Sequence, residues 1–204
     1  MTSRFRHSST HVVMAAALAA AVALTGAINA QDLATEQRAL SVQQALGRLT
    51  SYGVFDHVSF SVDRGRVTLA GYAYSGTLRR DAEKAVKRVA GVDEVENRIQ
   101  LLPASANDDR IRRATFYSIY TDSFLSRYAA GGAHAAYYEA IEFGRIPGRQ
   151  PFGDYPIHII VDGGRTTLFG VVDNLSDKRL AEMRAREVSG VFAVNSELLV
   201  ANAR

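Results

Sequence analysis

The sequence predicts an α+β fold made of two tandem two-layer sandwiches, each with the order helix-strand-strand-helix-strand and a three-stranded mixed sheet. The main observation is a repeat: residues 62–71 reappear as residues 161–170, with the same apolar, turn and glycine positions at an offset of 99 residues. A Gly-Val pair at position 91 returns at position 190, so the offset holds without a gap. A repeat of this length indicates two copies of one folding unit.

The amino-terminal region has the composition of a targeting segment. Residues 1–30 join a basic start to an Ala-rich apolar run over residues 12–24 and to small residues ending at Ala30. This layout predicts a secretory signal peptide cleaved near Ala30, with an uncleaved amino-terminal anchor as the alternative. Without Arg4 and Arg6 the Lys and Arg count falls from 24 to 22 against 21 Asp and Glu. Such a balance argues against a nucleic-acid partner.

The absence of cysteine limits how the exported chain is built and held. The sequence contains no Cys, so it forms no disulfide and carries no lipid-modified cysteine. We therefore expect a periplasmic protein that is not a lipoprotein. Its expected divisions are a first domain at 31–103, a linker at 104–108, and a second domain at 109–204 with an insertion at 129–154.

The elements of the first copy follow from the spacing of its apolar residues. Helical periodicity predicts a helix over residues 36–51. Alternation of apolar and polar residues then predicts two strands, at 57–62 and 66–71, joined by a tight turn in which Gly65 takes a positive φ. These two strands should form an antiparallel hairpin.

The second half of the unit adds one helix and one strand. Residues 77–90 place apolar side chains on one helical face, and Gly91 is a suitable helix stop. Residues 95–101 alternate again and predict the last strand. Because the second helix is long enough for a crossover, this strand should join the sheet in parallel. Both helices must then cover the same apolar sheet face, which gives two layers.

The repeated pattern resembles the BON domain of bacterial exported proteins. In the first copy the residues that carry the resemblance are Val62, Gly65, Val67, Thr68, Leu69, Gly71, Ala82, Ala85, Gly91, Val92, Val95 and Asn97. In the second copy they are Val161, Gly164, Thr167, Leu168, Gly170, Ala181, Gly190, Val191, Val194 and Asn195. The two Asn residues are out of register by one position. The resemblance covers nearly all of the chain after residue 30.

The resemblance implies a periplasmic or envelope module. Members of the family are similar to osmotically inducible periplasmic proteins and to dual-domain outer-membrane lipoproteins, and contact with phospholipid or membrane is proposed for them. This implication comes from the resemblance, whereas the remaining expectations come from the places where the second copy departs from the first.

The first departure is an aromatic stripe in the leading helix of the second copy. We expect this helix to begin at Asp108-Asp109 and to run to about residue 129. Phe116, Tyr120, Phe124 and Tyr128 recur in it at every fourth position. The stripe either docks in a membrane interface, which suits Tyr, or forms the core face of the helix.

The second departure is the insertion at 129–154. It is long for a connection, which indicates a function or internal structure, and a short helix is expected at 133–143. Its aromatic residues are Tyr137, Tyr138, Phe143 and Phe152. They predict a surface for lipid or a partner protein, unless the insertion folds back over its own sheet.

The third departure is a second sheet that is apolar on both faces. The face opposite the helices carries His158, Ile160, Thr167, Phe169 and Val171. Such a sheet should be covered on both sides. The insertion, the first copy or another molecule could provide the cover.

The sequence shows no pattern of catalytic residues, no metal-ligand spacing and no cofactor motif. We therefore predict a non-enzymatic envelope protein whose modules bind phospholipid or the membrane surface during envelope or osmotic stress. The alternative is a protein–protein interaction or assembly module in the periplasm.

Overall fold

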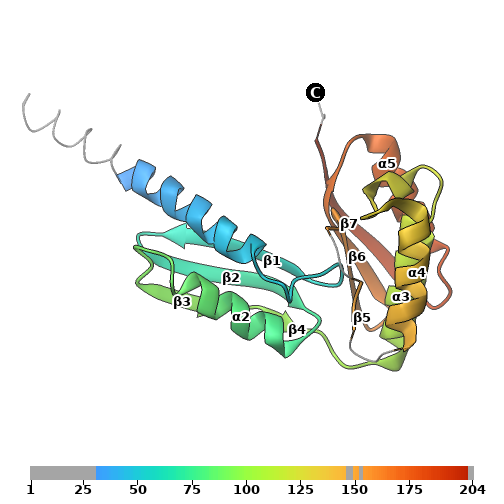
Figure 1. The fold of residues 1–204 in the computed structure, drawn as a ribbon, viewed down its shortest axis with the longest axis horizontal. Helices are drawn as coiled ribbons and strands as arrows, with labels where there is room; N and C mark the ends of the chain where they lie inside the picture. The colour runs from blue at the N-terminus through green and yellow to red at the C-terminus, as the bar shows by residue number, and fades with distance from the viewer. Residues whose placement is uncertain (1–30, 146–148, 152–153, 202–204) are drawn as a thin grey trace, which may run out of the picture.

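The structure is a computed structural model that describes residues 31–145, 149–151 and 154–201. The predicted signal peptide and Phe152 lie outside the described residues, and the side chain of Phe143 is not described either. Figure 1 shows two modules side by side, each built around its own sheet. The α+β class and the tandem arrangement are as the sequence predicts.

The first module begins with a helix over residues 31–47, which ends four residues earlier than expected because 48–52 form turns. Its other elements are β1 (His57–Asp63), β2 (Arg66–Ala73), α2 (Gly76–Val86), β3 (Glu94–Asn97) and β4 (Gln100–Leu101). The hairpin β1–β2 is antiparallel, and β3 and β4 both pair with β2 in parallel.

The second module repeats this plan and adds two helical pieces. Its elements are α3 (Ala106–Tyr120), η1 (Leu125–Tyr128), α4 (Gly132–Arg145), β5 (Ile157–Asp162), β6 (Arg165–Val172), α5 (Leu175–Arg186) and β7 (Ala193–Val200). The sheet order is β5-β6-β7, antiparallel and then parallel. The helix expected at 133–143 is α4.

The strand pairing shows that the repeat is also a repeat in space. Arg66 pairs with Glu94 in the first sheet, and Arg165 pairs with Ala193 in the second, so the same offset carries one register onto the other. The first sheet has four strands where three were expected, because its last strand is split between β3 and β4. The carboxamide oxygen of Asn97 accepts a hydrogen bond from the N–H of Ile99 and interrupts the strand there.

The repeated strand glycines allow two backbone segments to approach closely. Gly71 and Gly170 both adopt positive φ, 112° and 122°. A Cβ on Gly71 would overlap the carbonyl oxygen of His57, and one on Gly170 would overlap that of Pro156. Only glycine satisfies both constraints, which explains why this position recurs in the two copies.

The helix α3 differs from expectation at both ends. Its amino-terminal cap is Ser105, whose hydroxyl accepts a hydrogen bond from the N–H of Asp108, so the helix starts inside the range expected to be a linker. The helix ends at Tyr120 and not near residue 129. The Asp122 carboxylate accepts hydrogen bonds from the N–H groups of Phe124 and Leu125, which starts the separate turn of η1.

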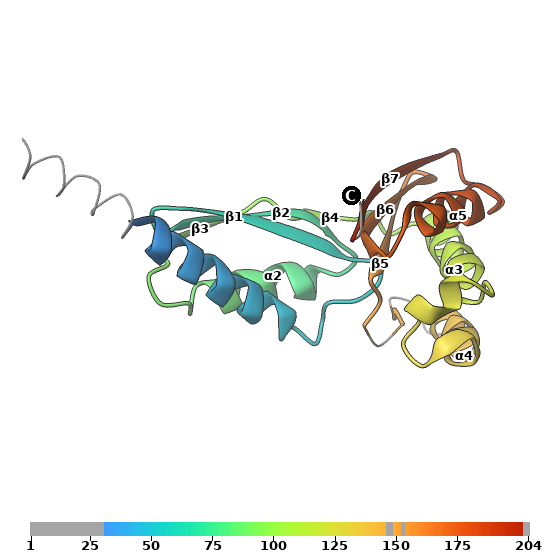
Figure 2. The ribbon, with the colours of Figure 1, turned by 90° about the horizontal axis from the view of Figure 1, so that it is seen from above.

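The helices cover one face of each sheet (Figure 2). In the first module the leading helix and α2 lie below the sheet. In the second module α3 and α5 pack on the sheet, while α4 packs on α3 and η1 as an outer layer. The helix α4 of the insertion therefore packs on the helical side of the sheet and not on its opposite face.

The first module covers part of that opposite face. The ring of His57 stacks on Phe169 with centroids 3.9 Å apart, and Tyr72 lies beside the same ring. Ile160 is buried, whereas Val171 stays 46 % exposed. Of the three covers that the sequence left open, the structure uses the first copy for this part of the sheet.

The close approach at Gly170 can be tested by substitution. Gly170→Ala should lower the free energy of unfolding by at least about 3 kcal/mol, because the new methyl group meets a carbonyl oxygen at a positive φ. Gly163→Ala is the matched control: Gly163 also has positive φ, but a Cβ there meets nothing within 4 Å. It should cost about 1 kcal/mol. Urea unfolding measures both, and equal losses would contradict the explanation.

Candidate functional site

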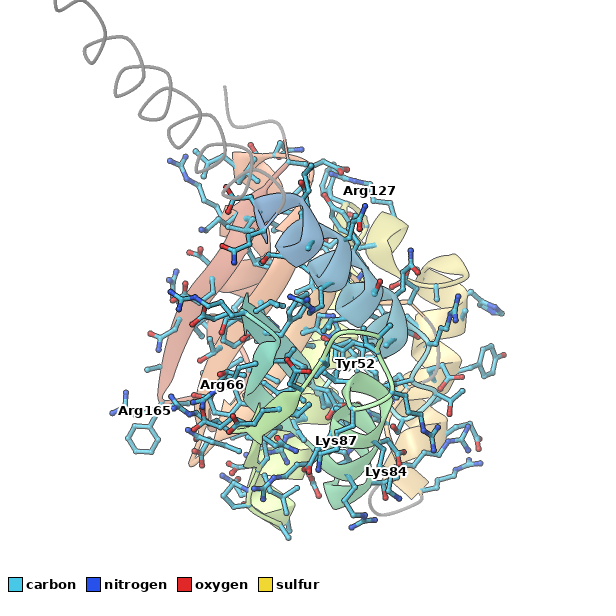
Figure 3. All side chains as sticks on the ribbon, turned by 90° about the vertical axis from the view of Figure 1, so that its left-hand side faces the viewer. Tyr52, Arg66, Lys84, Lys87, Arg127 and Arg165 are labelled. Atoms are coloured by element: carbon cyan, nitrogen blue, oxygen red, sulfur yellow. The ribbon has the colours of Figure 1, made fainter. Side chains whose placement is uncertain are left out.

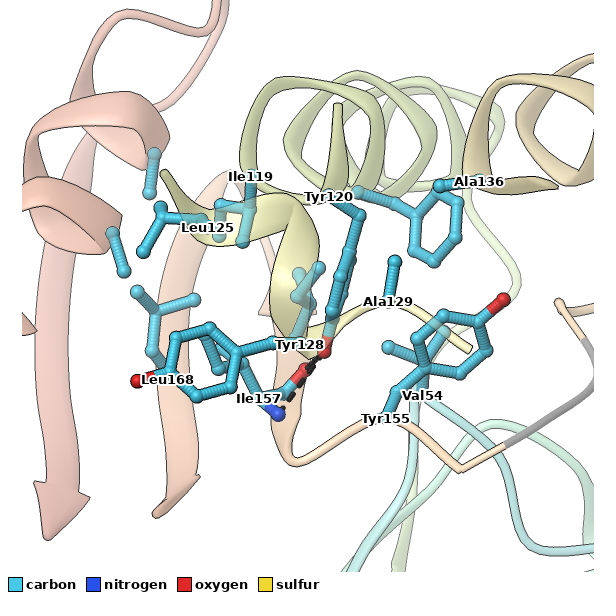
Figure 4. Packing of buried hydrophobic residues seen from close by; sticks show 14 of the residues in the cluster. Val54, Ile119, Tyr120, Leu125, Tyr128, Ala129, Ala136, Tyr155, Ile157 and Leu168 are labelled. Atoms are coloured by element: carbon cyan, nitrogen blue, oxygen red, sulfur yellow. Dashed lines mark hydrogen bonds between the residues drawn. The ribbon is translucent and has the colours of Figure 1, made fainter. Parts of the chain in front are cut away.

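Three aromatic residues of the predicted stripe belong to the core of the second module. Phe116 and Tyr120 are fully buried, and Tyr128 is 9 % exposed. The Tyr120 hydroxyl donates to the carbonyl oxygen of Ile157 at 2.6 Å and accepts from the N–H of the same residue at 3.0 Å, as Figure 4 shows. The Tyr128 hydroxyl donates to Asp177 at 2.7 Å. These side chains are therefore core residues and cannot form part of a contact surface.

The exposed aromatic residues all lie in the second module, within the part of the chain that the structure describes. They are Tyr117, Phe124, Tyr137, Tyr138 and Phe192. The large apolar side chains exposed on the first module are aliphatic: Leu33, Leu40 and Leu101. Figure 3 shows charged side chains such as Arg66, Lys84 and Lys87 on the surface of the first module.

Three tyrosines from α3 and α4 form one exposed cluster, which we call the tyrosine face: Tyr117, Tyr137 and Tyr138. The rings of Tyr117 and Tyr137 lie 6.2 Å apart, and those of Tyr137 and Tyr138 lie 5.6 Å apart. Two of these residues were predicted from the sequence as a contact surface, and Tyr117 joins them because α4 packs on α3. Phe124 is 67 % exposed in the turn after α3.

An open groove with a volume of about 610 Å³ lies beside the tyrosine face, between α3 and α4. It is lined by Arg110, Arg113, Ala114, Tyr117, Ala140, Ile141 and Arg145. The α3 members share one helix face, since positions 110, 113, 114 and 117 are three, four and seven residues apart. Three arginines line the groove, and one of them, Arg145, pairs with Glu142 at 3.0 Å.

A second polar cluster, which we call the joint, connects the two modules around Asp56. This carboxylate is fully buried and accepts hydrogen bonds from the N–H of Gly53 at 2.9 Å, the N–H of Tyr74 at 2.6 Å and the carboxamide of Gln150 at 2.6 Å. Burial raises the pKa of the Asp56 carboxyl, and the three donors oppose the rise. Gln150 belongs to the insertion, so the insertion also fixes the first module.

Two histidines lie in the same joint. The Nδ1 atom of His158 is 3.2 Å from the carbonyl oxygen of Gly53, and its ring packs edge-on against Tyr52. Burial lowers the pKa of His158 to about 4 and also lowers the pKa of His57. Both rings are therefore neutral at pH 7, and a neutral His158 can donate its Nδ1–H to Gly53.

Sequence reasoning missed the arginine groove and the joint. The groove had a visible signal, the spacing of Arg110, Arg113 and Tyr117, but its other wall comes from α4 and depends on how the insertion packs. The joint had no such signal in the sequence, because Asp56 and Gln150 are 94 positions apart. Nothing in the repeat pattern marks either residue.

Within the described residues no group of three or more His, Cys, Asp or Glu side chains is placed to hold a metal ion. In the same ranges no helix is both long enough and apolar enough to cross a bilayer. What the described surface offers is the tyrosine face and the groove, both of which are suited to binding.

The fold and these surfaces define a tandem α+β module of helix-strand-strand-helix-strand units, with an aromatic and basic face on the second unit. The BON domain family model matches residues 34–103 and 145–202. The chain belongs to the BON domain family. The second match begins at the end of α4, so the leading helix α3 and the insertion helix precede it.

Two solved structures resemble the chain weakly. One is CdsD, a structural protein of the type III secretion system of Chlamydia trachomatis, at 10 % identity, covering 79 % of this chain and 92 % of that chain with a TM-score of 0.25. The other is the C-terminal domain of CdsD, at 10 % identity, covering 78 % and 95 % with a TM-score of 0.24. At this level neither bears on function. No curated protein matches the chain.

The joint should make the protein less stable in acid. Because the pKa of His158 is about 4 when folded and about 6.5 when unfolded, the unfolded chain binds more protons between these values. The contribution of neutral His158 to the free energy of unfolding is fully present above pH 6.5 and decreases as the pH falls toward 4. At about pH 5 the loss should be about 2 kcal/mol relative to pH 8.

His158→Asn isolates this effect, because asparagine can keep a donor near Gly53 but does not titrate. The difference in unfolding free energy between pH 8 and pH 5 should shrink by about 2 kcal/mol in the variant. Asp56 acts in the opposite direction in both proteins and so cancels from the comparison. An unchanged pH dependence would show that His158 is not the responsible group.

Proposed function

We propose that this chain is an exported, non-enzymatic protein of the bacterial envelope that binds the phospholipid surface of a membrane through the tyrosine face of its second module. Its place is the periplasm, and its use is in envelope or osmotic stress. Family membership supports the envelope setting, and the tyrosine face supports the membrane contact.

The single observation that carries the proposal is the exposure of three clustered tyrosines on the outer surfaces of α3 and α4. Tyr117, Tyr137 and Tyr138 are 47 %, 44 % and 55 % exposed, whereas Phe116, Tyr120 and Ala136 on the same two helices are buried. Tyrosine suits the boundary between lipid headgroups and acyl chains, since its ring is apolar and its hydroxyl stays hydrated. Such a cluster would bind the membrane interface without insertion of a spanning helix.

A second candidate function is assembly with another envelope protein. The uncovered part of the second sheet supports it, because Val171 and Leu199 remain exposed on neighbouring strands, the latter at 68 %. The exposed residues of this patch, Val171 and Leu199, are aliphatic, so the patch presents no exposed ring. We therefore place membrane binding first.

Vesicle co-sedimentation of the chain without residues 1–30 tests the proposal. A variant with Tyr117, Tyr137 and Tyr138 changed to Ser should bind mixed phosphatidylglycerol and phosphatidylcholine vesicles on the order of 100-fold more weakly, at about 1 kcal/mol for each ring. No binding by the unchanged protein at low salt would overturn the proposal.

The matched control changes three exposed leucines of the first module, Leu33, Leu40 and Leu101, to Ser. These are 60 %, 54 % and 52 % exposed, so the apolar surface removed is comparable. The control variant should bind vesicles as the unchanged protein does. If both variants lose binding equally, the contact is a general apolar effect and not a property of the tyrosine face.

A further inference from the structure

We propose that two copies of this chain associate through the free edge of β7, which pairs antiparallel with β7 of the second copy about a two-fold axis at Ser196. Each subunit contributes the same strand to such an interface, so one surface is used twice. The pairing joins the two second-module sheets into one continuous sheet. It goes beyond the proposed function and does not depend on membrane binding.

The edge of β7 is long and regular. Within the described residues β7 is the last strand of the second sheet and pairs with β6 on one side only, away from β5 (Figure 2). It runs for 8 residues without a proline, and Glu197 is its one charged residue. A regular edge strand with little charge is a template for pairing with another strand.

The corresponding edge of the first module is interrupted. The offset of 99 residues places Asn97 at the position of Ser196. The Asn97 carboxamide donates to the carbonyl oxygen of Arg79 and accepts from the N–H of Ile99, and β3 ends there after 4 residues. The same edge carries three charged residues: Glu94, Glu96 and Arg98. Short strands and charges protect an edge from association. In the second copy the strand continues through Ser196 to Val200.

The sequence of β7 is self-complementary about Ser196. In a two-fold antiparallel pair centred there, residues at equal distances on either side lie opposite each other in the two subunits. The resulting pairs are Asn195 with Glu197, Val194 with Leu198, and Ala193 with Leu199. Polar residues therefore meet polar residues, and apolar residues meet apolar ones. A register centred on Glu197 would instead place two carboxylates opposite each other. This pattern favours a second copy as the partner.

The backbone of β7 presents its hydrogen-bonding groups as this register requires. The N–H of Ala201 donates to a carbonyl oxygen of β6, and alternate residues of a parallel strand face the same neighbour. Val194, Ser196 and Leu198 therefore direct their backbone groups to the free edge. In agreement, the carbonyl oxygen of Leu198 accepts a hydrogen bond from Nζ of Lys178 at 2.8 Å. In the pair this oxygen would accept from the N–H of Val194 of the partner subunit.

Two groups that are poorly satisfied in the single chain gain partners in the pair. The Oγ atom of Ser196 is buried and has no hydrogen-bond partner within the described residues. On the axis it lies opposite the same hydroxyl of the partner subunit, and cross-strand hydroxyl pairs of this kind form hydrogen bonds. Leu199, which is 68 % exposed, lies opposite Ala193 of the partner subunit and would lose contact with water.

Sedimentation equilibrium of the chain without residues 1–30, in the absence of lipid, measures the association. The unchanged protein should approach the mass of a dimer as its concentration rises. Asn195→Lys should lower the dissociation constant of the dimer about 5-fold, because two ammonium groups then face two Glu197 carboxylates, and Asn195→Glu should raise it about 5-fold. Asn195 is exposed, so both variants should fold, which thermal unfolding checks. A monomer at every concentration, or shifts in the same direction, would overturn the inference.

The matched control makes the same charge changes on the other sheet, as Ser61→Lys and Ser61→Glu. Ser61 is an exposed residue of β1, which is an edge strand of the first sheet. These variants should change the dissociation constant less than about 2-fold, since they leave the pairs of β7 as they were. Shifts as large as those at position 195 would overturn the inference, because association would then follow net charge or use the first module.

A cross-link tests the position of the axis. The chain has no Cys, so Ser196→Cys introduces a unique thiol on the axis. Paired Cα atoms there would be about 5.5 Å apart, within the range of a disulfide, so mild oxidation should give a covalent dimer. Ser61→Cys, the matched control, should stay monomeric, and equal cross-linking of both would overturn the inference. A dimer that fails to bind vesicles would overturn the proposed function alone, whereas a monomer that binds them would overturn this inference alone.

Discussion

The free edge of β5 is the constraint on which the arrangement of the two modules depends. This strand pairs with β6 on one side only, and its other edge faces the segment before β1. The N–H of Ile159 donates to the carbonyl oxygen of Val54 at 2.8 Å, and the side chains of Val54 and Phe55 enter the core of the second module. An unpaired edge beside a buried face would be costly and prone to association. The first module supplies one hydrogen bond to this edge and two apolar side chains to the second core, and so lowers that cost.

The buried carboxylate of Asp56 follows from the same constraint. Val54 and Phe55 pack in the core of the second module. Because Asp56 follows them directly in the chain, its side chain is buried between the two modules. None of its hydrogen-bond partners is a cation, so the two N–H groups and the Gln150 carboxamide must replace its hydration. The positive charge of Arg112 also lowers the pKa of Asp56. Arg112 is buried in α3, pairs with Asp109 and lies over the ring of Tyr74, with its guanidinium carbon 5.2 Å from the centroid. The polar contacts of the joint thus come from both modules and the insertion.

The sequence was sufficient wherever one periodicity decides the structure and insufficient wherever two parts of the chain meet. The hairpins, the crossover helices and the register follow from alternation and from a fixed offset. The aromatic stripe could not be resolved, because a four-residue spacing fits a core face and a surface face equally well. Tyr120 is buried and its hydroxyl donates a hydrogen bond to the carbonyl oxygen of Ile157 in β5, 37 positions away, whereas Tyr117 is exposed. The groove likewise needs α3 and α4 together, and helical spacing describes only one of its walls.

The helix α4 forms an outer layer of the second module. The sheet is already covered by α3 and α5 on one face and partly by the first module on the other, so α4 adds no layer that the core requires. Only a few of its residues, such as Ala136, are buried, while Tyr137 and Tyr138 face outward. Exposed rings in a cluster do not stabilise the fold, and the arginines beside them crowd like charges into one groove. The membrane contact proposed for the tyrosine face would cover these rings. The insertion thus contributes a few small side chains such as Ala136 to the core and presents Tyr137 and Tyr138 on its outer face.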